Sequence, residues 1–251
     1  MGSPDASPTP SLDSGSDAPL LAACSPIDAG LSGAIDLSTF TVRGTASYNE
    51  NGDGRITLTN SETSQAGAAW APEQLPAGVS GIDLTWAFRV GPDDTAGDGV
   101  AFAVLAGGAP GVGAGGDGVG LQSIAPAVGG PVLAGYAVDM DMYQNTTDMT
   151  DIAPNTLKLV AMPAFAIVAE TAVPPALNDG NSYTIDVAWR APSTLTATLH
   201  GPNGQDFTAT SNDPRLAAPP MAAWVGFTGA TGGISDSHNE ISSLTFIDVC
   251  K

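Results

Sequence analysis

From about residue 34 onward, the chain alternates short apolar or β-branched runs with turn residues, and this pattern constrains the fold most. Period-two alternation at residues 55–59 follows Asn51-Gly52-Asp53-Gly54, a sequence typical of a hairpin turn. Further strands are predicted at residues 82–90, 99–105, 134–142, 156–161, 182–190, 194–200, 222–228 and 240–248. Because no amphipathic helix pattern separates these runs, the sequence predicts an all-β fold, a sandwich of two antiparallel sheets. The Gly-rich segment 107–120 is predicted to be a long loop.

The composition suits many strands joined by turns and limits the possible partners. The 251 residues include 31 Gly and 20 Pro, enough chain for one large β domain or two small ones. Acidic residues outnumber basic residues by 26 to 7, which gives a formal net charge of −19. We therefore expect no nucleic-acid partner and no anionic membrane surface, because their phosphates would be repelled. No apolar run approaches the roughly 20 residues that span a bilayer, so we expect no transmembrane segment.

The two ends of the chain carry different signals. Residues 1–22 are rich in Ser, Pro and Asp and are predicted to be a disordered lead-in or linker, and residues 23–251 form the β domain. Cys24 and Cys250 lie near the two ends of that domain, where chain termini often approach each other. We expect a disulfide between them, and the alternative is two unrelated thiols. A disulfide implies an oxidising compartment, so the protein is predicted to be secreted or on the cell surface, with its native signal peptide removed.

Four oxygen-bearing side chains follow one another at and after the predicted strand 134–142. They are Asp139, Asp141, Asn145 and Asp148, at offsets of two, four and three residues. Carboxylates, amide oxygens and backbone carbonyls are the ligands that Ca²⁺ takes, and no His or Cys lies nearby to indicate a softer metal. In so acidic a chain, the same residues are also consistent with solvated side chains at a strand end. The residues alone leave both interpretations open.

Five segments, in order along the chain, resemble the motifs of L-type lectins, the legume lectin-like family. They are residues 40–60, 97–102, 115–121, 138–148 and 225–238. The second resembles the motif A-D-G-x-A-F, and the fourth resembles V-E-F-D-T-[YF]-x-N-x-x-D. The resemblance covers most of residues 34–249. It implies a concanavalin A-like jelly-roll sandwich that binds glycans or glycoconjugates without catalysis.

The resemblance also implies which residues contact a sugar. Asp98 accepts hydrogen bonds from sugar hydroxyls, Asn145 donates its amide group, and Tyr143 supplies an aromatic ring. The glycine loop contributes Gly116 and Asp117, and the last specificity loop contributes Gly232, Gly233 and Ile234. This last loop resembles the version found in animal mannose-binding members, which favours mannose-type glycans. In the family the Asp of A-D-G follows a cis peptide bond, so Gly97–Asp98 is predicted to be cis.

For the metal, the resemblance implies one Ca²⁺ ion held by Asp141, Asn145, Asp148 and the backbone carbonyl of Tyr143. Asp151 is an alternative to Asp148, and Asp179 is a weaker candidate from further along the chain. A second, transition-metal site would use Asp139, which stands where the family has Glu. No His follows within the next 50 residues, where legume proteins have one, and this departure argues against the second site.

Two other function classes remain open at this stage. Glycoside hydrolases share the fold, but they need paired carboxylates, and the chain has no Glu between Glu73 and Glu170. A Ca²⁺-stabilised structural or adhesion module that has lost sugar binding is the closer alternative. We interpret His238 as a residue that secures a loop at the last strand, and the four tryptophans as core residues. The sequence leaves the glycan specificity and the oligomeric state open.

Overall fold

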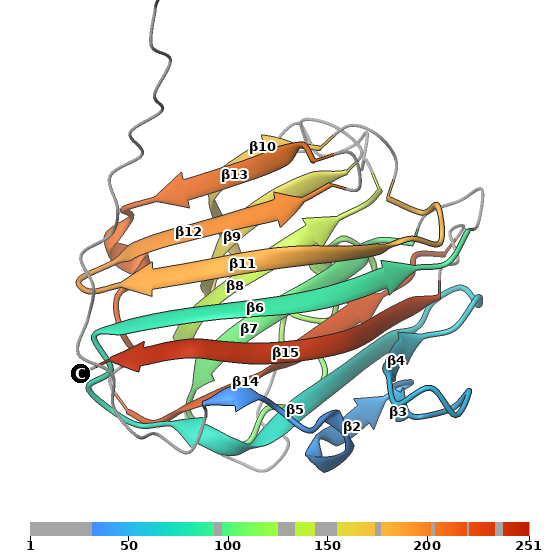
Figure 1. Ribbon diagram of the computed structural model, residues 1–251, viewed down its shortest axis with the longest axis horizontal. Helices are drawn as coiled ribbons and strands as arrows, with labels where there is room; N and C mark the ends of the chain where they lie inside the picture. The colour runs from blue at the N-terminus through green and yellow to red at the C-terminus, as the bar shows by residue number, and fades with distance from the viewer. Residues whose placement is uncertain are drawn as a thin grey trace, which may run out of the picture.

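The computed structural model describes residues 32–92, 97–124, 134–143, 155–173, 177–201, 204–219, 221–233 and 238–250. These residues form two antiparallel sheets that lie face to face (Figure 1). The eight-stranded sheet has the order β13 (Asp206–Ser211), β12 (Thr194–His200), β11 (Ser182–Arg190), β6 (Gly81–Val90), β15 (Asn239–Cys250), β4 (Ile56–Thr59) and β3 (Ser47–Tyr48), with β1 (Gly33–Ala34) paired to β15. The seven-stranded sheet has the order β10 (Ala166–Ala172), β9 (Thr156–Met162), β8 (Ala134–Asp141), β7 (Gly99–Ala106), β14 (Ala223–Ala230), β5 (Ala66–Leu75) and β2 (Thr41–Gly44). The helical turns are the 3-10 segments η1 (Leu37–Thr39), η2 (Gly116–Gly118) and η3 (Pro214–Leu216).

The predicted all-β sandwich is confirmed, and so are all nine predicted strands, with small shifts at their ends. Period-two patterns place apolar side chains between the sheets, where aromatic rings pack against one another. The ring of Phe227 lies 5.4 Å from that of Trp86 and 5.7 Å from that of Phe102, measured between centroids. Tyr136 stacks on Trp189 at 6.0 Å, across the sandwich. Trp70 instead packs on the outer face of the seven-stranded sheet, with Trp224 partly buried beside it.

Some strands are missing from the sequence-based prediction, notably β5, β10 and β13. Strand β5 contains Pro72, which normally argues against an internal strand. The ladder between β5 and β14 shifts register between Trp224 and Gly226, and Pro72 lies opposite this shift. A bulge thus accommodates the proline. Strand β13 is polar, and its Thr208 and Thr210 hydroxyls bond to threonines of β12 at 3.0 and 3.1 Å.

The predicted glycine-rich loop, residues 107–120, is confirmed as a loop, and with the residues up to 124 it covers the outer face of the seven-stranded sheet. Its apolar residues Val119, Leu121 and Ile124 pack on the alanines and leucine that β7 presents on this face. Gly120 has φ +71°, and a Cβ atom there would lie 3.2 Å from the Cβ of Thr228. The close approach of loop and sheet therefore requires glycine at this position.

Four strands of the seven-stranded sheet end or begin in line with one another. Ala230 pairs with Gly99, Gly99 with Asp141, and Asp141 with Thr156. This row lies toward the end of the sandwich where the arrowhead of β8 lies in Figure 1. The described residues next to these strand ends, among them Asp98, Tyr143 and Gly232, therefore lie at one end of the molecule.

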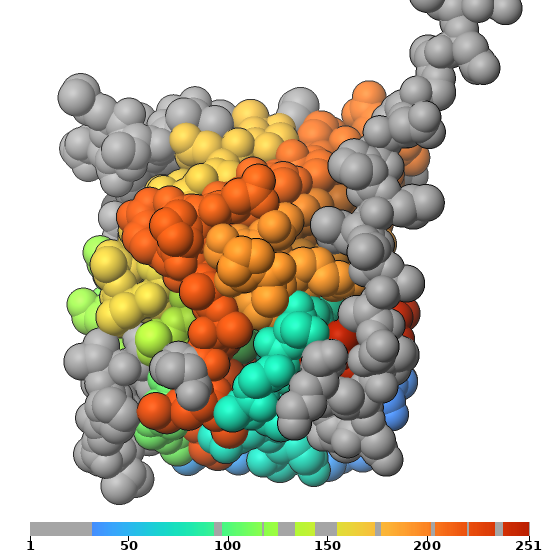
Figure 2. All heavy atoms as spheres, turned by 90° about the vertical axis from the view of Figure 1, so that its left-hand side faces the viewer, coloured from blue at the N-terminus to red at the C-terminus, as the bar shows by residue number. Residues whose placement is uncertain are grey.

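The opposite end of the sandwich faces the viewer in Figure 2. There the orange segment that follows β13 runs across the gap between the two sheets. Within it, Leu216 is fully buried, and its carbonyl accepts a hydrogen bond of 2.8 Å from the indole of Trp189. This end is closed by side-chain packing. In the part of the chain that the structure describes, no helix is long and apolar enough to cross a membrane.

Candidate metal and sugar site

Asp98 begins the candidate site, immediately before β7. Its backbone carbonyl accepts a hydrogen bond of 3.0 Å from the amide of Met142, the residue that follows β8. The Asp98 side chain is only 3% exposed. The structure thus holds one predicted sugar ligand against the end of the strand that carries the predicted metal ligands. The predicted cis bond at Gly97–Asp98 is wrong, because the cis peptides of the described residues are Met162–Pro163 and Ala191–Pro192.

Two buried carboxylates, Asp139 and Asp141, lie near the end of β8, at 1% and 2% exposure. They alternate with Val138 and Met140, whose side chains belong to the core between the sheets. Because side chains of a strand alternate between faces, both carboxylates project from the outer face of the seven-stranded sheet. Carboxylates this deeply buried need a compensating cation or several hydrogen-bond donors.

Lys158 of β9 supplies one such cation, and sequence reasoning missed it. The lysine is the direct register partner of Asp139, and its Nζ forms an ion pair with Oδ2 of Asp141. The side chains of the pair are 7% and 3% exposed. The other oxygen of Asp141, Oδ1, accepts a hydrogen bond of 3.0 Å from the amide of Tyr143. The only signal in the sequence was a single charged residue inside the apolar strand Thr156–Met162.

Only some of the predicted calcium ligands lie within the described residues. Asp141 and Tyr143 are described, whereas Asn145, Asp148 and Asp151 lie outside the described residues. Within those residues, no group of three or more His, Cys, Asp or Glu side chains comes together as a metal site. The described residues alone therefore do not test the predicted set of calcium ligands.

Asn155 adds an observation that fits a hard cation. It is 9% exposed, and among the described residues its buried Oδ1 has no hydrogen-bond partner. Asn155 immediately precedes Thr156, the register partner of Asp141. Amide and carboxylate oxygens form the donor set that Ca²⁺ prefers, so the residues present fit this ion. The weaker candidate Asp179 is engaged in a local turn, where it accepts hydrogen bonds of 2.8 Å from the backbone of Asn181 and the hydroxyl of Tyr183.

The glycine loop and the segment after β14 also meet at this end. A Cβ atom on Gly115 would lie 3.7 Å from the carbonyl oxygen of Thr231, so the loop places Gly116 near this segment. Thr231 donates its hydroxyl to the carbonyl of Glu62 at 2.7 Å, and the Gly232 carbonyl accepts from the Ser64 amide at 2.8 Å. The segment after β14 is therefore fixed to the connection between β4 and β5. Of the remaining predicted contacts, Gly233 is exposed, while Ile234 and the side chain of Asp117 lie outside the described residues.

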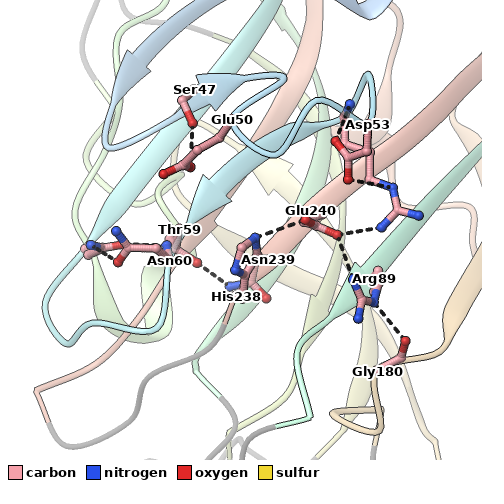
Figure 3. Close-up of polar contacts among 12 residues, drawn as sticks. Ser47, Glu50, Asp53, Thr59, Asn60, Arg89, Gly180, His238, Asn239 and Glu240 are labelled. Carbon is pink, nitrogen blue, oxygen red and sulfur yellow. Dashed lines mark hydrogen bonds and ion pairs between the residues drawn. The ribbon is translucent and has the colours of Figure 1, made fainter.

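A network of charged side chains around Glu240 lies on the eight-stranded sheet at the same end (Figure 3). Glu240 is 2% exposed, and its Oε2 lies 2.7 Å from Nη1 of Arg55 and 3.4 Å from Nη1 of Arg89. Nε2 of His238 lies 3.0 Å from Oε1 of the same carboxylate. Arg89 also donates to the carbonyl of Gly180 at 2.8 Å. His238 thus lies beside Glu240 at the start of β15, a position that fits its structural interpretation, which stays a prediction.

Cys250, the last residue of β15, is fully buried. Its predicted partner, Cys24, lies outside the described residues, as does the predicted lead-in, residues 1–22. The pairing of these two cysteines stays a prediction.

Comparisons with known proteins place this geometry among legume lectins. No protein-family model matches the sequence, and no curated protein matches it. Among solved structures, lectin II from Ulex europaeus has a TM-score of 0.69 at 20% identity, covering 88% of this chain and 99% of that one. A Bauhinia forficata lectin in complex with GalNAc has a TM-score of 0.65 at 20% identity, covering 84% and 92% of the two chains. The metal-free form of lectin I-B4 from Griffonia simplicifolia has a TM-score of 0.67 at 19% identity, covering 83% and 92%. The predicted concanavalin A-like sandwich is therefore confirmed as the fold.

Proposed function

We propose that this chain, which has the fold of the legume lectins, is a secreted or cell-surface, Ca²⁺-dependent carbohydrate-binding domain without catalytic activity. One observation carries the proposal. Asp98, the glycine loop and Thr231 lie with the buried carboxylate Asp141 at one end of one sheet. Legume lectins of similar fold are solved with GalNAc and with the methyl glycoside of α-L-fucose, which supports a sugar as the ligand here.

The arrangement of these residues suits a sugar, which presents several hydroxyl groups and an apolar ring face. The carboxylate of Asp98 provides acceptors for neighbouring hydroxyls. Gly116 and Gly232 have no side chains, so a sugar can approach their backbone groups closely. Tyr143 is half-buried after β8 and can present its ring to the apolar face. By the family resemblance, mannose-type glycans are the first ligands to test.

The role proposed for Ca²⁺ is to hold the ligand-binding loop in place. Asp141 and the Tyr143 carbonyl would hold the ion from the described residues, and Asn145 and Asp148 would complete its coordination. An ion bound there supplies coordination bonds that fix the loop before the sugar arrives. Pre-ordering of this kind lowers the entropy cost of binding. The acidic chain, at a formal net charge of −19, also attracts cations to its surface.

Glycan-array binding in Ca²⁺, in chelator and after Ca²⁺ is restored tests the proposal. We expect binding to a defined glycan that is lost in chelator and recovered with Ca²⁺. Asp98→Ala should lose at least about tenfold in glycan affinity, because the buried acceptor is removed, and it should keep its Ca²⁺ affinity. Asp248→Ala, a change on the other sheet, is the matched control.

Two outcomes would contradict the proposal in different ways. Ca²⁺ binding without any glycan hit would favour the alternative, a structural or adhesion module that keeps the fold and the ion. Equal loss of glycan and Ca²⁺ affinity in Asp98→Ala would show that Asp98 supports the metal site and is not a sugar ligand.

A further inference from the structure

We infer that the ammonium group of Lys158 takes the place of a second cation beside the proposed Ca²⁺ site, so that the chain binds one divalent ion there and no transition metal. The inference rests on the proposed Ca²⁺ site and concerns the transition-metal position beside it. The residues present do not fit a transition metal at that position, for reasons of geometry, ligand supply and charge.

The geometry places the lysine where it reaches both carboxylates of β8. Lys158 and Asp139 are direct partners across the β8–β9 ladder, which puts their Cβ atoms about 4.5–5.5 Å apart. Asp141 lies two residues further along the same face of β8, and Nζ of Lys158 forms an ion pair with its Oδ2. All three residues are at most 5% exposed. Oδ2 of Asp141 is therefore already paired with a cation.

The ligand supply points the same way. Imidazole nitrogen is a favoured ligand of several transition metals, and the chain has two histidines. Both histidines are engaged on the other sheet: His200 lies between Asp186 and Asp206, at 2.9 and 2.8 Å, and His238 lies beside Glu240. No imidazole is left for the outer face of the seven-stranded sheet.

The distribution of basic residues makes Lys158 distinctive. The chain has five arginines and two lysines, and Lys158 is the one basic residue in strands β7, β8 and β9. Four of the arginines pair with carboxylates elsewhere: Arg55 and Arg89 with Glu240, Arg190 with Asp83, and Arg215 with Asp213. Asp139 and Asp141 together carry two negative charges, and the ammonium of Lys158 offsets one of them, so the pair has less charge left to attract a second divalent ion.

The two carboxylate oxygens of Asp141 consequently have different partners. Lys158 holds Oδ2 of Asp141 permanently, while Oδ1 faces the segment after β8 through its hydrogen bond with the Tyr143 amide. Asp141 is thus oriented before any metal arrives. The lysine supplies this order without any dependence on Mn²⁺ or Zn²⁺ in the surroundings.

Metal stoichiometry tests the inference directly. The full chain, equilibrated with Ca²⁺ and Mn²⁺ together and measured by native mass spectrometry, should carry one ion. Mn²⁺ titration followed by electron paramagnetic resonance should show no tight Mn²⁺ site in the Ca²⁺-loaded protein. Lys158→Met keeps the length of the side chain and removes its charge, so it should gain a Mn²⁺ site at least about tenfold tighter than the wild type. Lys251→Met, the other lysine, is the matched control and should gain none.

A second measurement keeps the inference testable if Lys158→Met does not fold. With ¹⁵N-labelled lysine, the two lysines give two ammonium signals, and that of Lys158 should exchange slowly with water in both chelator and Ca²⁺. Fast exchange of both signals, or a wild type that binds Ca²⁺ and Mn²⁺ together, would overturn the inference. If the wild type binds no Ca²⁺, the proposed function is wrong. The exchange rate of the Lys158 ammonium signal would still decide the role of the lysine.

Discussion

Replacing Glu240 with Gln should reveal how far the charged network of Figure 3 stabilises the ligand-binding end of the sandwich. The substitution keeps the shape of the side chain and removes its charge. Glu240 is 2% exposed, and it lies within 3.4 Å of the cationic groups of Arg55 and Arg89 and 3.0 Å from Nε2 of His238. Through Arg89 the network also reaches the carbonyl of Gly180, in the turn before β11.

The magnitude follows from what each partner loses. Breaking a buried ion pair typically costs about 3–5 kcal/mol, since the remaining charge is left without compensation. Here the side chains of Arg55 and Arg89 are 28% and 37% exposed, so water can solvate them in part once the carboxylate is gone. We therefore expect Glu240→Gln to lower the free energy of unfolding by about 2–3 kcal/mol. For a domain of this size, that corresponds to a fall in Tm of roughly 4–12 °C.

Urea unfolding at neutral pH measures the effect, with Glu50→Gln as the matched control. Glu50 is exposed and accepts one hydrogen bond, 3.0 Å from the Ser47 hydroxyl, so its replacement should change stability by less than about 0.5 kcal/mol. Adding Arg55→Met to Glu240→Gln should cost less than the sum of the two single changes, because the partners share one interaction. Equal small effects from Glu240→Gln and Glu50→Gln would refute the reasoning.

Three further predictions concern single positions. Thr228→Val should leave the free energy of unfolding unchanged or raise it by about 0.5 kcal/mol, because the Thr228 hydroxyl is fully buried without a hydrogen-bond partner among the described residues. A fall of more than about 1 kcal/mol in that free energy would show that the hydroxyl is bonded. Gly120→Ala should lower the free energy of unfolding by about 1–2 kcal/mol and weaken glycan binding, because φ is +71° and the new Cβ would crowd Thr228. Unchanged glycan binding would show that this loop does not contact the ligand. The pKa of His200 is raised by its hydrogen bonds to Asp186 and then Asp206, so its contribution to stability is fully present below about pH 6.5 and is lost as pH rises through the raised pKa. The stability difference between wild type and His200→Gln in urea should accordingly be larger at pH 5.5 than at pH 9, and the reverse order would contradict this assignment.

The strands were predictable because their inward-facing residues are apolar at period two and their ends carry turn residues. Strand β11 is an example, with Tyr183, Ile185, Val187 and Trp189 buried in alternation. Strand β5 was missed because Pro72 argues against an internal strand, and its bulge depends on pairing with β14, far away in the sequence. Strand β13 was missed because its outer face is polar. In both cases the deciding contact lies on another strand.

The candidate site was predictable only where residues follow one another in the chain. The alternation of Asp139 and Asp141 with apolar neighbours placed both carboxylates on one face. Lys158 was missed because its pairing with Asp141 depends on the register of β8 against β9, which a list of motifs does not specify. Asn155 was missed because it belongs to no motif, and its significance lies in the burial of an oxygen without a partner.

At the end of the sandwich where the proposed site lies, two anchors of buried charge add to the backbone ladders of their strands. On one sheet, Glu240 fastens the start of β15 to Arg55 and Arg89, and on the other, Lys158 fastens Asp141 to β9. Loops that must fit a ligand cannot be held by ladder hydrogen bonds along their whole length, so their attachment points must carry the rigidity. Because each anchor joins strand ends and not loop tips, loop sequences can change without loss of either network. On this reasoning, the loop tips determine ligand specificity, while the buried charges determine whether the strand ends that carry those tips are held in place.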